Sequence, residues 1–166
     1  MIDPKMFTAS LEAGDKELAC HSICDVAEDI FYAKGADAIP APLKTVFAVE
    51  TFHGQETNGG LEQYLTNGHE SLAVYAASAL ERVGLDLPSK ILRSVLELFP
   101  EEIKESKEPN YLDYFDEIED QKGSEYIGNN IEQELWDWYH GGNKETIQDK
   151  LHDCIVSNEE RFINQP

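Results

Sequence analysis

Residues 72–100 read LAVYAASALERVGLDLPSKILRSVLELFP, and this stretch decides the fold. Apolar residues recur every three or four positions on both sides of Gly84, which is the spacing of an amphipathic helix and not the alternation of a strand. Gly84 and Pro100 are helix-stop signals, and Pro88 suits the first turn of the second helix. The stretch therefore predicts two helices that pack as an antiparallel hairpin.

The same helical period continues on both sides of the hairpin. Before it, helices are predicted from 15 to 33, from about 40 to 53, and from 61 to 66, with a break at the two adjacent glycines 59 and 60. After it, we expect helices over 111–121, 127–138 and 147–162, the last with Asn143 as its N-cap. We expect an all-α fold, a single-domain bundle of about seven to nine helices over residues 1–166, with residues 1–14 poorly ordered or peripheral.

The net charge of the protein limits which classes of partner it can bind. Thirty-three acidic residues oppose thirteen basic ones, for a net charge of −20, while the hydrophobic content of 41% is enough for a folded core. Direct binding to nucleic acid or to an anionic membrane needs clustered basic residues, and none cluster here. No apolar run spans a bilayer, the N-terminus does not resemble a signal peptide, and the three cysteines fit reduced thiols. We expect a cytoplasmic protein with a basic protein partner.

Residues 101–125 are the most acidic part of the chain, with ten acidic and three basic residues. Carboxylates three and four positions apart on a helix lie on one face, and such rows resemble the phosphates along a DNA groove. One row is predicted over 101–108 and a second over 113–120. Charge alone is also compatible with a solvated surface. The predicted partner-binding residues are Glu101, Glu102, Glu105, Glu108, Asp113, Asp116, Glu117, Glu119, Asp120 and Glu125.

The sequence offers little for catalysis. Cys20 and His21 are neighbours in sequence, and consecutive helical residues do not face each other. The chain has no Gly-x-Ser-x-Gly elbow, phosphate-binding loop or dinucleotide fingerprint, so no enzyme activity and no cofactor are predicted. One alternative is a metal bound by Glu50 and His53, which have the Glu-x-x-His spacing of helical metal sites.

A second alternative is an acidic interaction protein that binds its partner through an apolar patch. The aromatic residues Trp136, Trp138 and Tyr139 are the candidates for such a patch. Their simpler interpretation is a contact in the core or in a dimer interface. An apolar interface would show weak salt dependence, in contrast to the steep dependence of a charged one.

Residues 56–67 read ETNGGLEQYLTN. This run resembles the Asn-Gly-Gly-(aromatic or Leu)-x-Gln-(Tyr or Phe)-x-x-Asn signature of a bacterial family whose best-known member is described as a DNA-mimic protein. A weaker likeness runs from about residue 40 to 160. The positions that carry the motif are Asn58, Gly59, Gly60, Gln63, Tyr64 and Asn67.

The resemblance implies an all-α fold, an acidic surface, a homodimer and no catalytic activity. It also implies binding to a transcriptional regulator or nucleoid protein in place of DNA. For the motif itself we expect a structural role, with glycines in conformations that other residues resist and with polar side chains that cap helix ends.

Overall fold

A computed structural model describes residues 4–123, 126–127 and 131–163. These residues contain ten α-helices and no strand, which confirms the all-α prediction with slightly more helices than expected. The helices are α1 (Pro4–Glu12), α2 (Lys16–Lys34), α3 (Ala41–Thr66), α4 (Ala73–Arg82), α5 (Asp86–Leu96), α6 (Glu101–Lys104), α7 (Leu112–Lys122), α8 (Gln133–Trp138), α9 (Lys144–Ser157) and α10 (Glu159–Ile163). Short 3₁₀ turns precede α3 and α4, and a π-helical turn (Tyr139–Asn143) joins α8 to α9.

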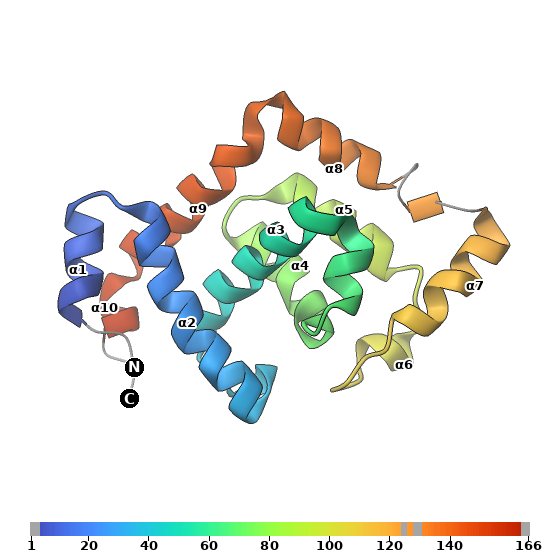
Figure 1. The fold of residues 1–166 in the computed structure, drawn as a ribbon, viewed down its shortest axis with the longest axis horizontal. Helices are drawn as coiled ribbons and strands as arrows, with labels where there is room; N and C mark the ends of the chain where they lie inside the picture. Colours follow the sequence, from blue (N-terminus) through green and yellow to red (C-terminus); the bar gives the residue numbers. More distant parts are fainter. Residues whose placement is uncertain (1–3, 124–125, 128–130, 164–166) are drawn as a thin grey trace.

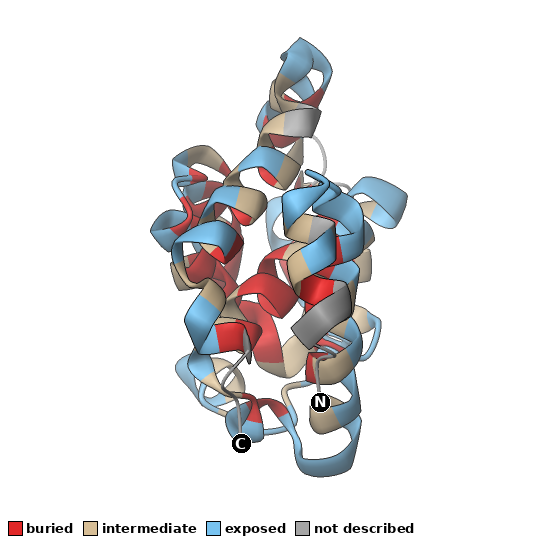
Figure 2. Cartoon of the chain, turned by 90° about the vertical axis from the view of Figure 1, so that its left-hand side faces the viewer, coloured by how far each residue is buried: buried red, intermediate tan, exposed pale blue. Residues whose placement is uncertain are grey.

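Helix α3 is the centre of the fold. It packs against α2 on one side and against α4 and α9 on others (Figure 1). Its side chains Val46, Val49 and Phe52 are fully buried, and Figure 2 shows the buried residues gathered on the inner faces of the surrounding helices. At about 25 cal/mol per Å², burial of this apolar surface is the main force that holds the bundle together.

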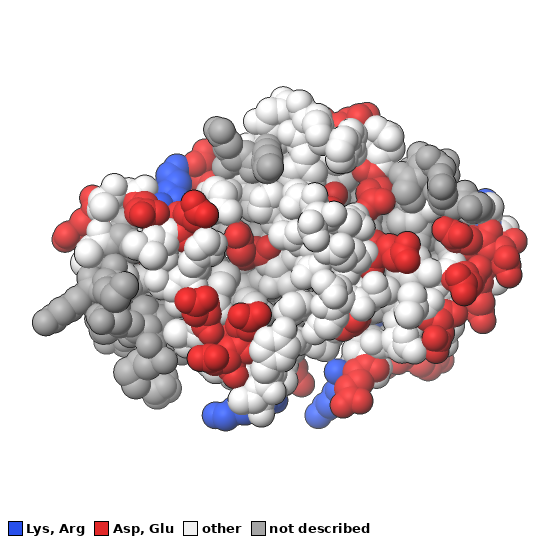
Figure 3. All heavy atoms as spheres, viewed as in Figure 1, with Lys and Arg blue, Asp and Glu red and all other residues white. Residues whose placement is uncertain are grey.

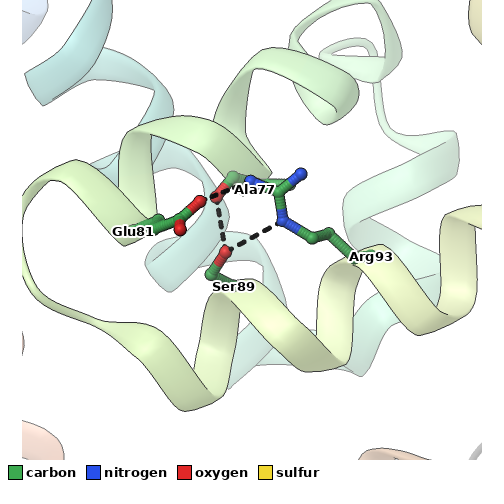
Figure 4. A network of polar contacts seen from close by, with 4 residues as sticks. All are labelled: Ala77, Glu81, Ser89 and Arg93. Carbon is green, nitrogen blue, oxygen red and sulfur yellow. Dashed lines mark hydrogen bonds and ion pairs between the residues drawn. The ribbon is translucent and has the colours of Figure 1, made fainter.

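The predicted hairpin is confirmed as α4 and α5, which pack against each other along their length. Gly84 takes a positive φ of 79° at the turn, and α5 begins two residues earlier than Pro88. Ser89 Oγ donates a buried hydrogen bond of 2.7 Å to the carbonyl oxygen of Ala77 (Figure 4). Arg93 then joins the two helices at the surface, because its guanidinium lies 2.7 Å from a carboxylate oxygen of Glu81.

The two ends of the described chain lie together at one side of the bundle (Figure 1). Phe7 of α1 is fully buried, and its ring centroid lies 6.0 Å from that of Phe162 in α10. The helix predicted over 147–162 is interrupted at Asn158, whose side chain donates to the carbonyl oxygen of Cys154. This interruption and α1 account for part of the higher helix count.

Asn143 is confirmed as the N-cap residue directly before α9, but its side chain makes no capping hydrogen bond. Its side-chain amide donates backward to the carbonyl oxygen of Trp138 and does not accept from the helix. Of the helices in the described residues, none combines the length and the apolar character needed to cross a membrane.

Candidate functional site

Helix α7 presents a row of carboxylates to solvent. Phe115 and Ile118 are buried on its inner side, and the ring of Phe115 lies 5.4 Å from that of Phe99 at the end of the α4–α5 hairpin. The opposite side is exposed and carries four carboxylates at the spacing i, i+3, i+4, i+7. This row, named the acidic row below, consists of Asp113, Asp116, Glu117 and Asp120.

The row predicted over residues 101–108 does not exist as one helical row. Helix α6 ends at Lys104, Glu105 occupies its C-cap, and Glu108 lies in the loop that follows. Pro109 disfavours helical backbone at Glu108, the residue before it, so a helix through residue 108 is not favoured. Glu101, Glu102, Glu105 and Glu108 are all exposed, but they follow the loop and not a single face.

Acidic side chains gather at the end of the molecule that carries α7 (Figure 3). Lys104 of α6 pairs with one of these acidic side chains, because its ammonium lies 2.6 Å from a carboxylate oxygen of Glu101. Glu119 is half-buried and is not part of the acidic row. Glu125, the tenth predicted residue, lies outside the described residues. The structure therefore divides the predicted set into an ordered row on α7 and a scattered group before it.

The Asn-Gly-Gly motif forms a kink inside α3. The backbone is non-helical at Gly59 and Gly60, and Gly60 has a φ of 78°, which favours glycine. The N–H of Leu61, where the helix resumes, donates to the carboxylate of Glu132 from a segment 71 positions later in the chain. A Cβ atom at Gly60 would overlap that same carboxylate. The predicted structural role of these glycines therefore has a physical basis in the close approach of Glu132.

Asn67 is the C-cap residue of α3, as expected, but the side chains of Gln63 and Asn67 bond to another side chain and not to the backbone of a helix end. The side-chain amides of Gln63 and Asn67 both donate to the side-chain oxygen of Gln55, at 2.7 and 2.8 Å. Gln55 lies on the other side of the kink, so these bonds hold the two halves of α3 together. Tyr64 is fully buried with its ring edge-on to Phe52, at 5.2 Å between centroids.

A pocket of about 340 Å³ opens beside the kink, between α3 and α8. Glu56, Gly60, Glu132 and Trp136 are among the residues that line it. Glu56 is only 6% exposed, and burial raises the pKa of its carboxyl to about 7, while the negative Glu132 adds to this rise and Tyr139 opposes it. Sequence reasoning gave no role to Glu56 or Glu132, because the contact between them depends on long-range packing.

The metal hypothesis gains no support from the arrangement of side chains. Glu50 accepts a hydrogen bond from the amide of Gln148 at 3.2 Å, and the ring of His53 stacks on that of Tyr139 at 5.7 Å. Over the part of the chain that the structure describes, no three His, Cys, Asp or Glu side chains are grouped so as to hold a metal ion. Glu50 and His53 are thus engaged in separate contacts.

The simpler interpretation of the three aromatics, a contact in the core, is confirmed for Trp138 and Tyr139. Tyr139 is buried and Trp138 packs against the core, and only Trp136 is strongly exposed, at 56%. The ring of Trp136 rests on His140, with 3.8 Å between centroids. A single exposed indole does not make an apolar interface of useful size. Trp136 also lines the pocket beside the kink.

The fold and the acidic row define a class of protein, namely an acidic helical binding protein whose charges are displayed on an anchored helix. The comparison with known families then identifies the family. The family model described as DMP19-like protein matches residues 37–158, so the chain belongs to the DMP19-like protein family. That name refers to DNA mimic protein 19, which supports DNA mimicry, a non-enzymatic kind of function, at this coarse level. No curated protein and no solved structure matches the chain.

Proposed function

We propose that the protein is a non-enzymatic DNA mimic that occupies the DNA-binding surface of a basic partner, such as a transcriptional regulator or a nucleoid protein. The observation that carries the proposal is the acidic row on α7, in a member of the DMP19-like family with a net charge of −20. We further propose that it acts in the cytoplasm and, from the resemblance to DNA-mimic proteins, that it is a homodimer.

The spacing of the acidic row supports mimicry of a DNA strand. Residues 113 to 120 span about 10 Å of helix axis at about 1.5 Å per residue, so the four carboxylates average one charge per ~3.5 Å, with separate rises of about 4.5, 1.5 and 4.5 Å. One strand of B-DNA carries one phosphate per ~3.4 Å of helix axis. A cationic surface that matches the charge density of a DNA strand would therefore meet a similar density on α7.

The anchoring of α7 supports the proposal for a second reason. Tyr111, Phe115 and Ile118 are buried, and the rings of Tyr111 and Phe99 lie 4.8 Å apart, edge to face. A helix fixed by such contacts presents its carboxylates without first being ordered by the partner, which lowers the entropic cost of binding. The loop carboxylates Glu105 and Glu108 would add to the field and steer the approach of the partner.

The test is affinity capture from a bacterial lysate, with retained proteins eluted by a salt gradient and identified. Neutralising the acidic row (D113N/D116N/E117Q/D120N) should weaken binding of the captured partner by about tenfold or more, since four exposed ion pairs are lost. The matched control neutralises four exposed carboxylates of α2 and changes the net charge equally. These are Glu17, Asp25, Glu28 and Asp29.

The comparison of the two variants separates geometry from net charge. A large loss in the acidic-row variant with a small loss in the α2 variant would support mimicry at α7. Equal losses would show that only the overall charge matters. Full binding by the acidic-row variant would refute the proposal for this face.

A further inference from the structure

The pocket beside the kink is lined by a buried carboxylate with one oxygen unsatisfied. Glu56 is more than nine-tenths buried, and its Oε2 atom has no hydrogen-bond partner. The hydroxyl of Tyr139 is near enough to favour the charged carboxylate, but it makes no hydrogen bond of standard geometry with it. A buried carboxylate left in this state is costly, and a cation that reached it would remove much of that cost.

The other residues that line the pocket also favour the binding of a cation. Glu132 contributes a second carboxylate, which the N–H of Leu61 holds in place. No Lys, Arg or His is present among the lining residues, all of which are described. Gly59 and Gly60 have no side chains, so they contribute only backbone to the pocket wall at the kink. The pocket is thus negative and free of an internal counter-ion.

Trp136 indicates which kind of cation the pocket would bind. Its indole lines the pocket and is 56% exposed, and the ring of His140 lies against one of its faces. An indole face attracts cations, and a planar guanidinium stacks on it while its N–H groups reach carboxylates in a fork. The volume of about 340 Å³ is sufficient for one side chain, but small for an extended ligand.

We propose that this pocket receives an arginine side chain of the basic partner, with the guanidinium between the Glu56 and Glu132 carboxylates and stacked on Trp136. The inference rests on the proposed function for the nature of the partner, but it concerns a different surface from the acidic row. The row would supply long-range attraction to many cations, while the pocket would select a particular residue.

The probe is a blocked tripeptide, acetyl-Gly-Arg-Gly-amide, titrated into the full-length protein at about pH 8, where Glu56 is charged. Binding is followed by NMR at the indole N–H of Trp136, and Trp138 serves as an internal reference. We expect a saturable shift at Trp136. The same peptide with citrulline, which is neutral and of similar shape, should shift it at least about tenfold more weakly.

Two variants test the residues. Glu56→Gln should lower the affinity for the arginine peptide about tenfold, and Trp136→Ala, measured by calorimetry, about fivefold. The acidic-row variant should keep peptide binding at Trp136. Equal binding of the arginine and citrulline peptides, or unchanged affinity in both pocket variants, would overturn the inference and leave the proposed function standing. Lost partner binding only in the pocket variants would instead refute the role of the row.

Discussion

Replacement of Glu56 by Gln should make the protein more stable at alkaline pH. The folded protein raises the pKa of this carboxyl from 4.5 to about 7, mainly through burial. An acid whose pKa is raised on folding binds its proton more tightly in the folded state, so its contribution to stability is lost as the pH rises from 4.5 through 7. Glutamine keeps the size of the side chain and carries no charge to desolvate.

The magnitude follows from the shift in pKa. The rise of the pKa from 4.5 to about 7 corresponds to about 3 kcal/mol at pH values well above 7. Between about pH 5.5 and pH 8.5 the wild type should lose about 2 kcal/mol of unfolding free energy relative to Glu56→Gln. The lower limit stays above the isoelectric point of about 4.4, where an acidic protein loses solubility.

The assay is urea denaturation followed by far-ultraviolet circular dichroism at several pH values. Glu62→Gln, at an exposed position of the same helix, corrects for the general relief of charge repulsion and should give a curve parallel to that of the wild type. If the curves of the wild type and Glu56→Gln are also parallel, the carboxyl of Glu56 is not desolvated and the reasoning is refuted.

Three further predictions concern stability in the same assay. Gly60→Ala should cost about 1–3 kcal/mol, because it forces alanine to a positive φ and against Glu132, whereas Gly54→Ala in open space on the same helix should stabilise by about 0.5–1 kcal/mol. Ser89→Ala should cost about 1–2 kcal/mol through its buried hydrogen bond, while Ser94→Ala should stay within about 0.5 kcal/mol. The acidic-row variant should be at least as stable as the wild type, since like charges repel along α7. Equal costs in the glycine pair or in the serine pair would contradict the first two predictions, and a destabilised acidic-row variant would contradict the third.

The fold was predictable where local signals agree. The apolar period and Gly84 were sufficient for the α4–α5 hairpin, and the two glycines at 59 and 60 marked the break inside α3. The prediction of one helical row over 101–108 is wrong, because α6 ends at Lys104 and Pro109 disfavours helical backbone at Glu108. A charge pattern alone does not specify where such a helix ends.

The candidate site was predictable only in part. Exposed carboxylates on α7 follow from the helical period, since Phe115 and Ile118 define the buried side. The contact of Glu132 with Leu61, and the pocket that it forms with Glu56, depend on how distant segments pack. The bridge from Gln55 to Gln63 and Asn67 likewise needs the angle of the kink. A sequence pattern does not specify such an angle.

The most direct test of DNA mimicry is competition for the partner identified by capture. Labelled duplex DNA bound to that partner is titrated with the protein, and the bound fraction is read by fluorescence anisotropy at two salt concentrations. We expect complete displacement of the DNA by the wild type, weaker at higher salt, and displacement by the acidic-row variant only at about tenfold higher concentration or more. A stable complex that contains the partner, the DNA and the protein together would contradict DNA mimicry.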